Sequence, residues 1–65
     1  MRLRVNGEDR DFPPELDISG LLVLLDAPPE GVAVAVNEEV VPRTMRDRPL
    51  CEGDRVEVIR AVGGG

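Results

Sequence analysis

The chain ends in Gly63, Gly64 and Gly65, and these glycines are the residues whose type and spacing point most directly to chemistry. They add no side chain to a core, and ordering the backbone of each residue costs about 1–2 kcal/mol, so a gain in stability does not explain them. A terminus without side chains can enter a narrow channel and present its carboxylate to the active site of another enzyme. There the carboxylate can be activated as an acyl-adenylate, which a sulfur nucleophile converts to a thiocarboxylate and an amine to an amide. The alternative interpretation is an incidental flexible end.

The rest of the chain offers little for catalysis. There is no His, and the single Cys, Cys51, can form neither an intramolecular disulfide nor a zinc site by itself. The acidic neighbours Glu52 and Asp54 do not favour a thiolate, so we expect Cys51 to be buried and inert. Adjacent carboxylates such as Glu38 and Glu39 lie in a predicted turn, where a solvated role is the expectation. The sequence therefore predicts a protein that is not an enzyme and binds neither a metal nor a cofactor.

The balance of charges excludes several classes of partner. Thirteen acidic residues against eight basic ones give a net charge of −5, whereas binding to a phosphate backbone needs a basic surface. Phe12 is the only aromatic residue, which also argues against a protein that stacks bases on rings. The longest apolar run, residues 21–25, is too short to cross a bilayer, and the N-terminal segment does not resemble a secretory signal. We expect a cytoplasmic protein without nucleic-acid or membrane partners.

Alternating polar and apolar residues predict short strands that could position this terminus. Asn6-Gly7 is a strong signal for a hairpin between the first two strands, and Pro13-Pro14 ends the second. Valines at 32, 34 and 36 predict a strand that is central in its sheet or closely covered on its alanine face. The predicted strands span residues 2–5, 10–12, 32–36, 40–41 and 55–62.

One helix is predicted between the second and third strands. Its apolar residues recur at the spacing of one helical face, namely Ile18, Leu21, Leu22 and Leu25. Asp17 can cap its first turn, while Val23 and Leu24 fall off the apolar face. Gly20 costs about 1 kcal/mol relative to Ala inside a helix, so packing against a sheet must compensate.

This order of elements predicts an α+β fold of the β-grasp type, in which one helix covers a mixed sheet of four to five strands. Residues 43–49 contain three arginines and show no period, so we expect a surface connection there, followed by Leu50 and Cys51 turning inward. The β-grasp domain is expected to span residues 1–62, and a flexible glycine tail residues 63–65.

Four stretches, in this order, resemble the ThiS family of ubiquitin-like sulfur carrier proteins of thiamine biosynthesis. They are residues 5–8 in the first hairpin, 32–43, 52–58 at the turn into the last strand, and 61–65 in the tail. The block at residues 32–43 is the most characteristic. Two positions depart from the family pattern, since Met45 stands where the family often has an aromatic residue and Gly20 is atypical for a helix. Neither position touches the proposed chemistry.

The resemblance implies a cycle in which other enzymes act on the terminus. A ubiquitin-activating-like adenylyltransferase would use ATP to adenylate the Gly65 carboxylate, and a persulfide donor would then supply the sulfur of a thiocarboxylate. Thiazole synthase would take the sulfur, while Gly64 and Gly63 give the terminus access to these active sites. The chain would be a recycled co-substrate with no bound cofactor, and the ATP would be consumed by the partner.

Apolar residues expected to leave the core could form a docking patch for these partners, namely Val41, Met45 and Ile59. The alternative is the ordinary scatter of apolar residues over a protein surface.

Two other classes of function stay open, a sulfur carrier of another pathway and a protein modifier or interaction module. The turn, strand and glycine pattern of the last third also resembles the small subunit of molybdopterin synthase and sulfur carriers for tRNA thiolation. A protein modifier or plain interaction module, in which the tail is conjugated to a lysine or is inert, belongs to a different class.

Overall fold

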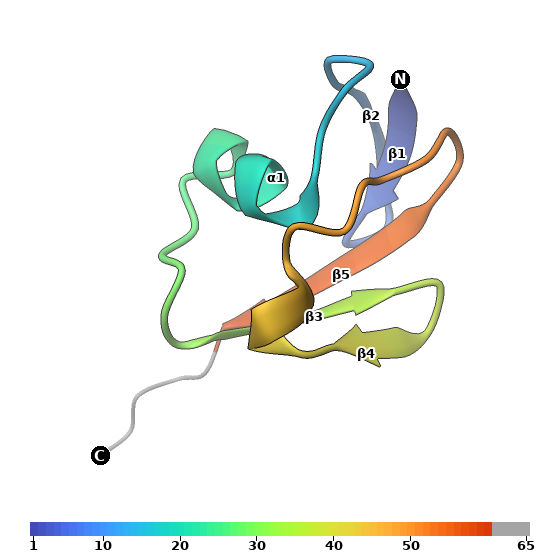
Figure 1. Cartoon of the computed structure of the whole chain (residues 1–65). Coiled ribbons are helices and arrows are strands. Elements are labelled where there is room, and N and C mark those ends of the chain that lie inside the picture. Colours follow the sequence, from blue (N-terminus) through green and yellow to red (C-terminus); the bar gives the residue numbers. More distant parts are fainter. Residues whose placement is uncertain (61–65) are drawn as a thin grey trace.

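In a computed structural model of the protein, which describes residues 1–60, five strands form one sheet and a single α-helix packs on one face of it (Figure 1). The elements follow the chain as β1 (Arg2–Val5), β2 (Glu8–Asp11), α1 (Ile18–Leu24), β3 (Val32–Val36), β4 (Glu39–Val41), the 3₁₀ helix η1 (Arg43–Met45) and β5 (Arg55–Arg60). The glycines at 63–65 and the predicted end of the last strand at 61–62 lie outside the described residues.

The strand order is β2-β1-β5-β3-β4. β1 runs parallel to β5, with Val5 opposite Val56, while the other neighbours are antiparallel. The sheet is therefore mixed, and the predicted β-grasp fold is confirmed. β5 lies in the middle of the sheet although it is the last strand in sequence (Figure 1). Arg60, the last residue described, consequently lies in the central strand.

Two asparagines in hairpin turns hold β5 between its neighbours. Asn6 and Asn37 have φ angles of 49° and 51°, in the left-handed region that asparagine tolerates better than most residues. The side-chain Oδ1 of Asn6 accepts a hydrogen bond from the N–H of Val58 at 2.9 Å, and Oδ1 of Asn37 accepts one from the N–H of Arg55 at 2.9 Å. Each turn therefore extends the hydrogen bonding of the sheet onto the central strand.

The helix forms and packs as its spacing predicts. Ile18, Leu21 and Leu22 are buried, and Oδ1 of Asp17 accepts a hydrogen bond from the N–H of Gly20 at 2.7 Å. A Cβ at position 20 would lie 2.9 Å from Cδ1 of Leu16, so a larger residue there would displace Leu16. Glycine avoids this contact, which a shift at the flexible end of the Leu16 side chain would also relieve.

The buried side chains form one core between α1 and the sheet. They are Leu3, Val5, Phe12, Ile18, Leu21, Leu22, Ala27, Val32, Val34, Val36, Val41, Leu50 and Val56. No helix within residues 1–60 is long and apolar enough to span a membrane.

Two sequence expectations are wrong in detail. The second strand runs from Glu8 to Asp11, so it begins directly after the Asn6-Gly7 turn, and Phe12 packs into the core beyond its end. Cys51 is exposed rather than buried, because the chain alternates there and Leu50 takes the inward position. The N–H of Cys51 donates to Oδ2 of Asp54 at 2.8 Å, which holds this outward turn.

The stretch 43–49 is mostly exposed, as expected, but Arg46 within it is buried. Its guanidinium donates from Nη1 to the carbonyl of Pro29 at 2.6 Å and from Nη2 to the carbonyl of Val32 at 2.7 Å. These bonds join the segment after β4 to the loop that precedes β3 and to the first residue of β3. Main-chain acceptors therefore compensate part of the burial of Arg46, while its buried Nε has no hydrogen-bond partner within the described residues.

Candidate functional site

The reactive group expected from the sequence, the carboxylate of Gly65, lies outside the described residues together with Gly63 and Gly64. The structure does describe the strand that leads to it. β5 alternates between the two faces of the sheet, so that Val58 and Arg60 lie on the side of α1 and Ile59 on the opposite side. Two distinct surfaces therefore adjoin the end of β5.

The first surface is the part of the uncovered sheet face formed by β3, β4 and the end of β5. Ile59 stands opposite Ala33, and Val40 stands opposite Ala35, in the registers of these strands. Ile59 is 57% exposed and Val40 is 76% exposed. Ala33 and Ala35 of β3 lie between these two side chains, and the exposed Glu57 of β5 stands opposite Ala35 on the same face. We call Ala33, Val40 and Ile59 the outer apolar patch.

The predicted docking residues divide between core and surface. Val41 is buried at 6% exposure, so the expectation that it leaves the core is wrong. It stands opposite Val34 in the sheet, and this register turns Val41 toward α1 and its neighbour Val40 outward. Met45 in η1 and Ile59 in β5 are exposed at 54% and 57%. The sequence contained a signal for the missed residue, because Val40 adjoins Val41 and only one of two neighbours in a strand can face the core.

The remaining part of the same sheet face is charged. Arg2 pairs with Asp11 at 3.2 Å, and Arg4 pairs with Asp9 at 3.8 Å, across β1 and β2. The hydrogen bond and charge of Asp11 raise the pKa of the Arg2 guanidinium. Because these pairs are exposed, they contribute little stability. Their effect is to bound the outer apolar patch on one side with hydrated charges.

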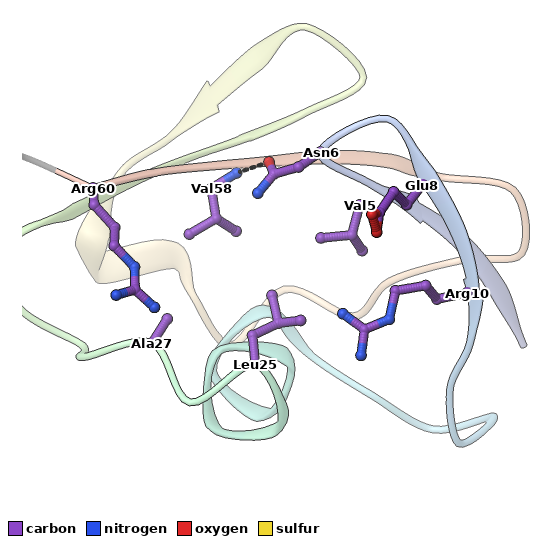
Figure 2. A pocket seen from close by; sticks show the side chains of 8 residues that line it. All are labelled: Val5, Asn6, Glu8, Arg10, Leu25, Ala27, Val58 and Arg60. Carbon is purple, nitrogen blue, oxygen red and sulfur yellow. Dashed lines mark hydrogen bonds between the residues drawn. The ribbon is translucent and has the colours of Figure 1, made fainter.

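The second surface is a groove on the α1 side of the sheet, with a volume of about 250 Å³. Its apolar wall consists of Val5, Leu25, Ala27 and Val58, and two arginines, Arg10 and Arg60, stand at its ends (Figure 2). We call this cavity the arginine groove.

Polar residues complete the arginine groove. Asn6 lines it while its Oδ1 accepts the hydrogen bond from Val58, and Glu8 lines it on the side of β2 (Figure 2). The guanidinium of Arg10 also lies 5.5 Å from the centre of the Phe12 ring, within the range of a cation–π contact. No local pattern in the sequence predicts this groove, since its residues come from three separate segments: the first hairpin, the end of α1 and the end of β5.

Residues 1–60 hold no group of three or more His, Cys, Asp or Glu residues arranged to bind a metal ion. Glu38 and Glu39 are both exposed at the turn into β4. Glu38 pairs with Arg55 at 3.5 Å, which is an ordinary surface contact.

A model of the ThiS family matches residues 3–65 of the chain. Among solved structures, the crystal structure of the thiamine biosynthesis protein ThiS from Geobacter metallireducens has a TM-score of 0.86 to this chain at 36% sequence identity, and the match covers 100% of both chains. The similarity in sequence and fold therefore extends over the whole of this chain.

Two curated relatives are much longer proteins. The thiazole synthases of Paramagnetospirillum magneticum and Magnetococcus marinus are 35% and 39% identical over an alignment of 66 positions. The alignment covers 100% of this chain and 20% of each synthase, so the chain spans one fifth of the length of these relatives. Each synthase contains a stretch similar to this entire chain.

Proposed function

The chain belongs to the ThiS family, and on that premise we propose that it is the sulfur carrier for the thiazole ring of thiamine. The observation that carries this proposal is the match of the family model through residue 65, which includes the three terminal glycines. The carrier is a co-substrate that acts in the cytoplasm and has no active site of its own.

In the proposed cycle, an oxygen of the Gly65 carboxylate attacks the α-phosphate of ATP on an adenylyltransferase, and pyrophosphate leaves. The outer sulfur of a persulfide donor then attacks the acyl carbon, AMP leaves, and an acyl disulfide forms. A thiol reduces that disulfide and becomes part of a new disulfide, so that Gly65 keeps the sulfur as a thiocarboxylate. Gly63 and Gly64 contribute access, because they carry no side chains that would obstruct a channel.

The outer apolar patch is the proposed docking surface for the adenylyltransferase, with Met45 as a further apolar contact. Exposed apolar residues gathered on one face are a common feature of protein interaction sites, and Val40 and Ile59 lie on the same face on either side of β3. Ile59 directly precedes Arg60 in β5, so a partner seated on this patch lies near the start of the terminal segment. Desolvating Val40 and Ile59 on binding would then help to hold the carrier while the terminus reacts.

The relatives support thiazole synthase as the acceptor. Two proteins with that name contain a stretch similar to this chain, which is expected if carrier and synthase act in succession. This similarity favours the thiazole pathway over the molybdopterin and tRNA-thiolation pathways. It attributes no synthase activity to the present chain, which spans one fifth of those proteins.

The proposal is tested by measuring the intact mass of the carrier after incubation with ATP, a persulfide source and the cognate adenylyltransferase. We expect one oxygen to be replaced by sulfur, and the change to map to the C-terminal peptide. A variant lacking Gly65 is the matched control, and it should remain unmodified while keeping the fold. An unchanged mass in the intact carrier, with the partner active on another ThiS protein, would contradict the proposal.

A further inference from the structure

We propose that the arginine groove is a second docking surface, which receives a segment of thiazole synthase that carries an apolar side chain next to a carboxylate. This inference rests on the proposed function for the identity of the partner. The groove itself is defined by the described residues.

The size and lining of the groove favour a peptide segment over a small molecule. Its volume of about 250 Å³ is below the roughly 300–1,000 Å³ that is usual for small-molecule sites. Val5 and Ala27 are buried, whereas Leu25 and Val58 are half-buried and contribute accessible apolar surface. One aliphatic side chain from a partner could cover this surface and remove it from water.

The charges of the groove favour a carboxylate as the second recognised group of the partner segment. Arg10 and Arg60 form no ion pair within residues 1–60, in contrast to Arg2, Arg4 and Arg55 on the opposite face. Figure 2 shows the guanidinium groups of Arg10 and Arg60 on the same side of β5 as Leu25, one toward each end of the cavity. Glu8 supplies one negative charge, so the lining carries a net charge of +1. The whole chain, in contrast, has a net charge of −5. A carboxylate on the partner is the complementary group, because arginine binds carboxylates in a bidentate geometry.

The position of the groove suits an enzyme that must reach the terminus. Arg60 lines the cavity and is the last described residue of β5, and the five residues that follow it can span at most about 18 Å. A partner held in the groove therefore has the Gly65 carboxylate within that distance. The groove also lies on the face of the sheet opposite the outer apolar patch. We assign the patch to the adenylyltransferase and the groove to the enzyme that uses the sulfur.

The experiment compares Arg10→Glu with Arg48→Glu, which makes the same change of charge. Arg48 is exposed in the loop before Leu50 and forms no ion pair within the described residues. Both variants should gain the thiocarboxylate as the wild type does, because Arg10 lies away from the outer apolar patch. We expect Arg10→Glu to weaken binding to the cognate thiazole synthase by about tenfold, and Arg48→Glu to change it by less than about twofold. Equal affinities of the two variants would overturn the proposal.

A second measurement locates the contact on the isotope-labelled wild-type carrier by NMR. Addition of the synthase should shift the amide signals of Leu25, Ala27 and Val58. Shifts confined to Ala33, Val40 and Ile59, or a response of the groove to the adenylyltransferase in place of the synthase, would overturn the proposal. Because unmodified carrier suffices for these binding measurements, they test the groove separately from the formation of the thiocarboxylate.

Discussion

Asn6 and Val58 are joined by a hydrogen bond although 52 positions separate them in the chain, with Oδ1 of Asn6 accepting from the N–H of Val58 at 2.9 Å. The N–H of Asn6 also donates to the carbonyl of Val56 at 2.9 Å. The Asn6 side chain therefore continues the β1–β5 pairing one step beyond the last pair of strand residues. Both residues line the arginine groove, so this bond fixes the strand end that connects the groove to the terminal segment.

Asn6→Gly should lower the free energy of unfolding by about 1 kcal/mol, because glycine accepts the positive φ but removes the hydrogen-bond acceptor. Asn6→Asp keeps the acceptor and should change stability by only a few tenths of a kcal/mol. Urea denaturation measures both effects. Hydrogen exchange at the Val58 amide gives the local readout, and exchange in Asn6→Gly as slow as in the wild type would show that the bond contributes nothing.

Arg46→Lys should destabilise the domain by about 2 kcal/mol. The arginine fork satisfies the carbonyls of Pro29 and Val32 together, and a compact ammonium group cannot reproduce that geometry. Since a domain of this size has a net stability of roughly 3–5 kcal/mol, the variant should remain folded at low temperature. Thermal and urea unfolding would measure the change.

Arg48→Lys is the matched control, because Arg48 is exposed two positions further along the same loop. Its stability should equal that of the wild type within about 0.5 kcal/mol. Equal stabilities of Arg46→Lys and Arg48→Lys would mean that the buried fork does not hold the two loops together.

The sequence predicts most of the fold because local patterns match the tertiary structure. The core contains Ile18, Leu21 and Leu22 from one face of the helix and the alternating valines of β3. The spacing of apolar residues in the sequence is therefore enough to identify both elements. The β4 strand is harder, because Val40 and Val41 are both apolar and alternation does not choose between them. The turn at residues 37–38 makes that choice by setting Val36 opposite Glu39.

Other features depend on contacts that no local pattern contains. Burial of Arg46 requires two carbonyls from residues 14 and 17 positions away, and the arginine at 46 has no distinctive neighbours in sequence. The arginine groove likewise needs the hairpin, the end of α1 and the end of β5 to meet. For the candidate site, the sequence correctly predicts that Met45 and Ile59 are exposed, while the cavity is visible only after folding.

The Glu38→Gly variant should have a free energy of unfolding about 1 kcal/mol higher than that of Glu38→Ala. Glu38 has a φ angle of 72°, where a side chain on Cβ is strained and glycine is not. Both variants lose the exposed ion pair with Arg55 at 3.5 Å, so the difference between them isolates the backbone term. Calorimetric unfolding would provide the comparison, and equal midpoints for Gly and Ala would contradict a strained turn.

Substitutions at the neighbours Val40 and Val41 should affect different properties, with Val40 affecting partner docking and Val41 affecting stability. Val41 is buried and Val40 is 76% exposed, so Val41→Ala should cost about 2 kcal/mol of stability through lost packing. Val40→Ala should leave stability within about 0.5 kcal/mol but slow adenylation at limiting carrier, because the outer apolar patch loses part of its contact area. Denaturation and steady-state assays with the cognate adenylyltransferase would measure the two effects. If Val40→Ala and the doubly charged variant carrying both Val40→Glu and Ile59→Glu are adenylated at the wild-type rate, the patch is not the docking surface.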